Sequence, residues 1–236
     1  MEDALKNVQM TAATGKRYAV MQNRRYIKQI RTFQQLLESG TIGTLGSVHA
    51  DFFLGPHFGG FRELMNHPLI IDMAIHTFDQ ARLLTGADPV SVYCYAFNPP
   101  GSWYKGEASA ICIFEMSNGV VFSYRGSWCA EGFHTSWESD WRVTGSKGTA
   151  RWDGENHPVC EVVDDKEPAA FLNRTKTVEV PDSWKGQTGH WGCLDEMFAS
   201  LEKNKPAETD CTDNIKSMAM VFGAVKSAET GKKIFL

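Results

Sequence analysis

A long series of strand patterns in the middle of the chain limits its fold more than any other feature. Between residues 90 and 180, seven short segments either alternate apolar with polar residues or are rich in β-branched and aromatic ones. Asn118 and Gly119 lie between two of these segments, and this dipeptide is typical of a tight β-hairpin turn. Consecutive strands joined by short turns pair in antiparallel fashion. The expected strands are residues 90–97, 108–116, 120–129, 136–144, 149–152, 159–163 and 176–180.

Helical patterns flank this region on both sides. Apolar residues recur there at helical spacing, and Gly15, Gly86 and Gly231 stand where three of the helices should end. We therefore expect an α+β fold with one large, mainly antiparallel open sheet and helices on one face. The expected helices are residues 2–13, 26–39, 68–86, 190–203 and 213–230, and two further strands are expected at 18–21, which should be buried, and at 47–53.

Composition and charge exclude several classes of protein. The chain has 236 residues, a net charge of −4 and a pI near 6.0, which argues against a nucleic-acid binder. It contains no apolar run of about 18 residues, so we expect no transmembrane helix, and its start lacks the features of a signal peptide. The six cysteines form no C-x-x-C pair and match no zinc module, so we expect small buried side chains in a cytoplasmic protein.

The helix expected at 68–86 carries the most informative polar residues. Asp72, His76 and Asp79 are spaced i, i+4 and i+7, which places them on one face of an α-helix. Most of their neighbours are apolar, so the helix should be buried, and buried charges are paired or functional. The pattern predicts either a polar cavity suited to proton transfer or a structural arrangement in which His76 is a core histidine and Asp79 pairs with Arg82.

Other kinds of site are less well supported by the sequence. The same helix face could bind zinc or manganese together with a nearby histidine such as His49, His57 or His67, but the H-E-x-x-H signature is absent and we expect no metal. Neither a G-x-G-x-x-G motif nor a P-loop occurs, which predicts that the chain alone binds no NAD(P) or nucleoside triphosphate. The absence of G-x-S-x-G disfavours a serine hydrolase.

Several short motifs together resemble one family of oxidoreductases. They are the runs 22–26 and 36–43, Arg62, the Asp72-x-x-x-His76-x-x-Asp79 pattern, and the runs 84–86 and 227–231. In this order and spacing they resemble the glucose–fructose oxidoreductase / inositol dehydrogenase / MocA family, and the resemblance covers nearly the whole chain. It implies the C-terminal domain of such a protein, with the open sheet of the dihydrodipicolinate reductase-like C-terminal domains.

The resemblance also implies a division of labour between two domains. Proteins of this family have an N-terminal Rossmann domain that binds NAD or NADP and a C-terminal domain that binds substrate and forms oligomer contacts. Residues 1–22 would then be a helix and strand of the nucleotide-binding domain or the crossover, and residues 23–236 the substrate-binding and oligomerisation domain. The catalytic lysine of the family would lie outside this chain, so activity is expected only in a full-length NAD(P)-dependent dehydrogenase. The alternative is a stand-alone, non-catalytic carbohydrate-binding or assembly domain.

The resemblance assigns roles to individual residues as well. His76 would be the catalytic base for a sugar, a polyol or a related secondary alcohol, and Asp72 would orient it. The side chains expected to contact the substrate are Arg24, Tyr26, His57, Arg62, Asp79 and His190. A homodimer or tetramer through the open sheet is expected, because strands 108–116 and 120–129 carry apolar residues on both faces.

Overall fold

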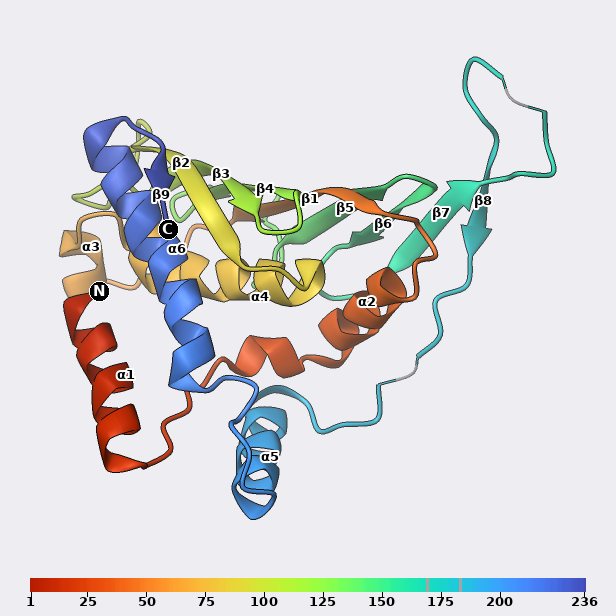
Figure 1. Ribbon diagram of the computed structural model, residues 1–236. Coiled ribbons are helices and arrows are strands. Elements are labelled where there is room, and N and C mark those ends of the chain that lie inside the picture. Colours follow the sequence, from red (N-terminus) through yellow and green to blue (C-terminus); the bar gives the residue numbers. More distant parts are fainter. Residues whose placement is uncertain (169, 183) are drawn as a thin grey trace.

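The computed structural model describes residues 1–168, 170–182 and 184–236 and is built around one large, mixed sheet (Figure 1). Its strands are β1 (Leu45–Phe53), β2 (Pro89–Phe97), β3 (Ser109–Met116), β4 (Val121–Ser127), β5 (Asp140–Gly145), β6 (Gly148–Trp152), β7 (Val159–Val163), β8 (Thr175–Val178) and β9 (Ile234–Phe235). Their order across the sheet is β8-β7-β6-β5-β1-β4-β3-β2-β9. Neighbours pair antiparallel except β1 and β4, which run parallel, so the α+β prediction is confirmed.

The helices cover one face of the sheet and leave the other open (Figure 1). They are α1 (Glu2–Thr14), a 3₁₀ turn η1 (Asn23–Tyr26), α2 (Lys28–Glu38), α3 (Phe61–Leu64), a π-helix η2 (Leu69–Ala74), α4 (Ile75–Thr85), α5 (Gly189–Glu202) and α6 (Cys211–Thr230). Helix α4 lies beneath the centre of the sheet and α6 packs along β2, whereas α1 and α5 project away from it. No helix in the described part of the chain is long and apolar enough to cross a membrane.

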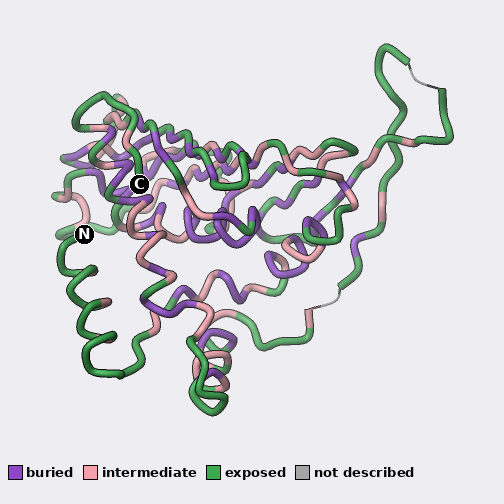
Figure 2. The backbone as a smooth tube through the Cα atoms, viewed as in Figure 1, coloured by how far each residue is buried: buried purple, intermediate pink, exposed green. Residues whose placement is uncertain are grey.

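The core lies between the helices and the inner face of the sheet. Along β1, Val48, Ala50 and Phe52 face inward and are buried, as their alternation predicts. Phe78 of α4 meets the inner face edge-on, with its ring centroid 4.8 Å from that of Phe114. Figure 2 shows the same alternation along the central strands, while α1 and the β7–β8 hairpin are largely exposed.

The outer face of the sheet carries a group of half-exposed apolar side chains on three neighbouring strands. Because successive residues of a strand point to opposite faces, these side chains point away from the helices. They are between 39% and 60% exposed, and none of the described helices covers them. We call this group the outer apolar patch; its members are Tyr93, Tyr95, Ile111, Ile113 and Val121.

The parallel pairing of β1 with β4 determines where the loops meet. Both strands end at the same edge of the sheet, at Phe53 and Ser127, and antiparallel β3 begins there at Ser109. The segments 54–68, 98–108 and 128–139 therefore gather at one end of the molecule. This end also receives the first turns of the helical segment that carries Asp72 and His76.

Some local expectations were wrong. Residues 18–21 are not a buried strand: Tyr18 and Met21 are 44% and 41% exposed, and the segment makes one isolated bridge, from Ala19 to Asp210. The segment has no sheet neighbour among the described residues, so its apolar residues stay near the surface. The two-residue edge strand β9, which pairs with β2, is too short for any sequence pattern to indicate.

Candidate functional site

The helix expected at 68–86 forms without a break, but it consists of two kinds of helix. Its first part, η2, is a π-helix over Leu69–Ala74, and α4 follows from Ile75. A π-helix contains more residues per turn than an α-helix and occurs often at functional sites. Asp72 lies within this widened segment and His76 is the second residue of α4, so the two are not related by ordinary α-helical spacing.

His76 is a half-buried imidazole held in its neutral form. Burial lowers its pKa, and the positive charge of Arg24 lowers it further, to about 4, although the carboxylates of Asp79 and Asp72 act in the opposite direction. The Nδ1 atom is buried without a hydrogen-bond partner among the described residues. At neutral pH this imidazole can therefore accept a proton, which is what a general base requires.

Asp72 is held by an arginine rather than by the histidine. The Nε atom of Arg62 donates a hydrogen bond to Oδ2 of Asp72 at 2.8 Å, and the side chain of Asp72 is 25% exposed. The Arg62 guanidinium in turn lies over the rings of Phe58 and Phe61, with its carbon 5.0 and 4.9 Å from their centroids. In the described structure no hydrogen bond joins Asp72 to His76, so Asp72 acts on the imidazole through its charge.

Arg24 of η1, the positive charge that acts on His76, is fixed by the turn that precedes β5. Its Nη1 atom lies 3.1 Å from Oε1 of Glu138 and also donates to the backbone carbonyl of Trp137. Gln80 of α4 donates to the second oxygen of Glu138 at 2.9 Å. Burial raises the pKa of Glu138, and Arg24 and Gln80 oppose that shift. We refer to Arg24, Arg62, Asp72, His76 and Glu138 together as the His76 site.

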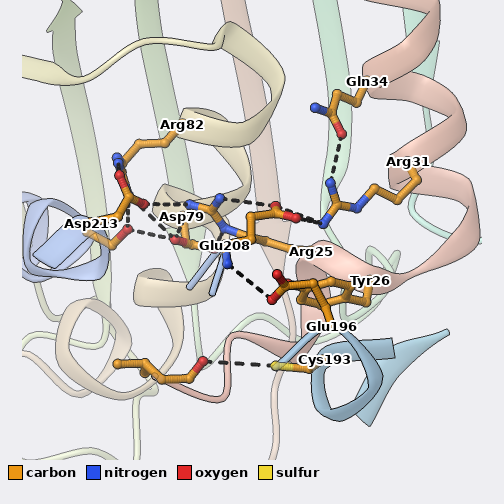
Figure 3. Close-up of polar contacts among 12 residues, drawn as sticks. Arg25, Tyr26, Arg31, Gln34, Asp79, Arg82, Cys193, Glu196, Glu208 and Asp213 are labelled. Carbon is orange, nitrogen blue, oxygen red and sulfur yellow. Dashed lines mark hydrogen bonds and ion pairs between the residues drawn. The ribbon is translucent and has the colours of Figure 1, made fainter. Parts of the chain in front are cut away.

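Asp79, three residues after His76 on α4, belongs to a buried ion-pair cluster (Figure 3). Arg25 donates from Nη2 to Oδ1 of Asp79 at 2.8 Å and also from Nε to Oδ2, and Ser217 donates to Oδ1 at 2.7 Å. The side chains of Arg25 and Asp79 are only 7% and 2% exposed. The expected pairing of Asp79 with Arg82 is present but long, at 3.9 Å, because Arg82 binds Asp213 at 2.8 Å. The expectation that Asp79 contacts substrate is corrected: its oxygens are taken by these donors in the core.

The remaining expected contacts fall into two groups. Tyr26 is 2% exposed, and its hydroxyl donates to Glu196 at 3.3 Å, so it too belongs to the core rather than to a pocket. His57 is exposed at the same end of the sheet as the His76 site and stacks on Trp103 with ring centroids 3.7 Å apart. His190 is exposed in the first turn of α5, the helix that packs on η1.

The sequence did not reveal Glu138. It lies inside the strand expected at 136–144, but β5 begins only at Asp140, and Ser139 has a positive φ of 70° that breaks the strand. An acidic residue next to a strand pattern does not indicate in the sequence which basic residue it will pair with in the folded protein. Among the described residues, no group of three or more His, Cys, Asp or Glu is placed to hold a metal ion.

Comparison with known sequences gives one family and one curated relative. The sequence model of the GFO/IDH/MocA C-terminal domain matches residues 30–151. The protein y4oX of Sinorhizobium fredii is 27% identical over 241 residues, an alignment that covers 99% of this chain and 66% of that protein. The chain thus spans slightly less than two thirds of the curated relative that it matches.

Solved structures with the same fold include three oxidoreductases. An oxidoreductase from Agrobacterium radiobacter, in complex with NAD⁺, L-tartaric acid and magnesium, superposes with a TM-score of 0.82 at 22% identity over 99% of this chain and 69% of its own. The WlbA dehydrogenase from Bordetella pertussis, with NADH and UDP-GlcNAcA, gives 0.78 at 19% identity over 100% and 68%. The aldose-aldose oxidoreductase from Caulobacter crescentus, with glycerol, gives 0.79 at 15% identity over 100% and 68%.

Proposed function

The chain belongs to the GFO/IDH/MocA family, to whose C-terminal domain it corresponds, and we propose that it binds substrate and forms oligomer contacts for an NAD(P)-dependent oxidoreductase of sugars, polyols or related secondary alcohols. One observation carries the proposal: a neutral, half-buried His76 lies within electrostatic reach of Arg24, which Glu138 binds, and of Asp72, which Arg62 binds. Such a residue set can accept the proton of a hydroxyl group and stabilise the oxygen that loses it.

The similar structures support the type of ligand. Their names report NAD⁺ or NADH in two cases, and L-tartaric acid and glycerol among the small molecules. Tartaric acid and glycerol both bear hydroxyl groups. They are consistent with a pocket that holds hydroxyl oxygens by hydrogen bonds, and Arg24, Arg62, His57 and His190 are the proposed donors and acceptors of this chain.

In the proposed reaction this chain supplies the base that accepts the hydroxyl proton. Oxidation of a secondary alcohol removes a hydride from carbon and a proton from oxygen, and NAD(P) supplies the hydride acceptor when it is bound in the full-length protein. Neutral His76 takes the hydroxyl proton, and the positive charge of Arg24 favours the negative charge that develops on that oxygen. Asp72, fixed by Arg62, offsets the positive charge that His76 gains.

We also propose the domain boundaries that the resemblance implies. The described residues include no glycine-rich strand–turn–helix unit for a dinucleotide. Residues 1–22 lie along α6 and its preceding loop, where Arg17 donates to Asn204 at 3.2 Å. They would form part of the connection to a nucleotide-binding domain, and residues 23–236 would form the substrate domain.

A binding experiment on this chain tests the proposal. We expect L-tartrate or glycerol at millimolar concentration to shift the NMR resonances of the His76 imidazole, because its exposed side would face the ligand. His49, on the outer face of the sheet, serves as the internal control and should not shift. NADH alone should leave both unchanged. Shifts confined to His49, or micromolar NADH binding in calorimetry, would contradict the assignment.

The outer apolar patch leads to a second expected result. We expect a homodimer in which two copies bury this patch, because monomers rarely expose a contiguous apolar surface of this kind. Sedimentation velocity of the wild type should give a mass near twice the 26.3 kDa of one chain. Replacing Ile111 and Ile113 together by lysine should give the monomer, whereas Leu5→Lys on α1, at a similar exposure, should not. A wild-type monomer would refute this interface.

A further inference from the structure

The turn that carries Glu138 is fixed by several hydrogen bonds and by one fully buried residue. Ser136 accepts a hydrogen bond from the Glu138 backbone N–H at 3.0 Å, and the Trp141 indole donates to the Glu138 carbonyl at 2.6 Å. Ser139 is fully buried at its positive φ, and its hydroxyl lies 3.3 Å from that of Thr77. A non-glycine residue in this conformation costs free energy, which the surrounding contacts must offset. The position of the Glu138 carboxylate therefore follows from a backbone that these hydrogen bonds hold in place.

This carboxylate binds the guanidinium of Arg24 at one end only. The side chains of Arg24 and Glu138 are 17% and 16% exposed, so the pair is largely removed from water. Nη1 of Arg24 is taken by Glu138 and by the carbonyl of Trp137. For Nε and Nη2 the described residues provide no partner, and these N–H groups remain free for an oxygen of a ligand.

Two independent links bring this pair to His76. Arg25, the residue after Arg24, binds Asp79, which lies three residues after His76 on α4. Ser139, the residue after Glu138, contacts Thr77, which directly follows His76. The first link attaches η1 to α4, and the second attaches the turn before β5 to α4. Both segments that hold the Arg24–Glu138 pair are therefore fixed to the helix that carries His76.

We propose that Glu138 is a positioning residue: it holds the positive charge of Arg24 beside His76 and so keeps that imidazole available as a proton acceptor. In this geometry the positive charge of Arg24 is, after burial, the second cause of the lowered pKa of His76. The charged groups on the elements around His76 are Arg24 and Arg25 on η1, Asp72 on η2, Asp79 and Arg82 on α4, Asp213 on α6, Arg62 on α3 and Glu138 itself.

The inference deepens the proposed function and rests on it for its chemical meaning. Proton transfer from a hydroxyl group to His76 forms an alkoxide and an imidazolium together. A guanidinium fixed there keeps the imidazole uncharged before the transfer and stabilises the alkoxide as it forms, and its free N–H groups can bind that oxygen. A freely moving Arg24 would lose this effect because it would be solvated by water. Glu138 thus contributes by fixing a charge in place before the reaction, without itself touching substrate.

The sign of one pKa change distinguishes positioning from simple charge effects. Loss of the negative Glu138 would, through charge alone, disfavour the imidazolium and lower the pKa of His76. If Glu138 instead holds Arg24 in place, Glu138→Leu frees the guanidinium to move into solvent, and the pKa of His76 rises. The two accounts predict opposite directions for the same substitution.

We would measure the pKa of His76 by NMR titration of the whole chain, with the resonance assigned by His76→Gln. Arg24→Gln should raise it toward the value of about 6.5 for an unperturbed imidazole, Arg24→Lys should keep it low, and Glu138→Leu should raise it. Arg17→Gln, a remote and exposed arginine substitution, is the matched control.

A pKa of His76 that falls or stays unchanged in Glu138→Leu overturns the proposal. If that variant does not fold, Arg24→Gln decides alone, and an unchanged pKa there overturns it as well. The titration requires neither substrate nor NAD(P). A full-length protein without dehydrogenase activity would refute the proposed function and leave this result standing. An unchanged pKa of His76 in the variants would overturn the role of Glu138 and leave the proposed function standing.

Discussion

His76→Ala in the full-length protein is expected to lower kcat by roughly 10²–10⁴-fold, the usual contribution of a positioned acid–base group. In the proposed reaction the substitution removes the neutral imidazole that would accept the hydroxyl proton, while Arg24 and Arg62, the proposed substrate contacts, keep their ion pairs with Glu138 and Asp72. KM should therefore change much less than kcat. Because burial and Arg24 lower the pKa of His76 to about 4, the wild-type base should lose activity through protonation only near that pH, well below the range in which an ordinary histidine titrates.

The control for this experiment is a histidine with a structural contact elsewhere. His157 bonds to the carbonyl of Val180 at 2.7 Å, in the turn between β6 and β7, and His157→Ala should leave kcat unchanged. The melting temperature separates the catalytic role from a structural one. If His76→Ala keeps its kcat and loses thermal stability instead, His76 is a core histidine, and the proposed function loses its central residue.

The sheet could be predicted from the sequence because its strands obey a local rule. Alternation of apolar and polar residues marked β2 to β7 within a few residues of their observed ends, and Asn118 with Gly119 marked the hairpin between β3 and β4. The parallel pairing of β1 with β4 could not be predicted in the same way. It depends on which strands meet after the chain has folded over helices η2 and α4, and strand-level patterns contain no such information.

The candidate site was predictable only in part, for a related reason. Asp72, His76 and Asp79 were found because they share a spacing, but the spacing argument assumes one straight α-helix. The π-helix η2 breaks that assumption, and Asp79 turns into the core, where Arg25 binds it. Glu138 is distant in sequence from Arg24, and their pairing arises only from tertiary structure.

The buried ion-pair cluster gives the largest expected effect on stability. Asp79→Ala should lower the free energy of unfolding by about 3–5 kcal/mol, since it removes the hydrogen-bonded partner of buried Arg25 and leaves only the longer contacts to Glu208 and Asp213, at 3.4 and 3.8 Å. Burial alone would lower the pKa of Arg25, but the carboxylates of Asp79, Glu208 and Asp213 raise it overall, so the guanidinium stays charged when its main partner is lost. It cannot relieve the cost by giving up its proton.

Urea denaturation measures this effect, and a double substitution shows its origin. Replacing Arg25 by methionine and Asp79 by leucine together should cost less than Asp79→Ala alone, because the buried guanidinium that loses its hydrogen-bonded partner is then absent as well. The matched control is the exposed pair of Lys6 and Glu2, whose side chains are 59% and 84% exposed. Glu2→Ala should cost less than about 1 kcal/mol. If Asp79→Ala costs as little as Glu2→Ala, the cluster does not stabilise η1 on α4, and the frame that holds Arg24 beside His76 must have another basis.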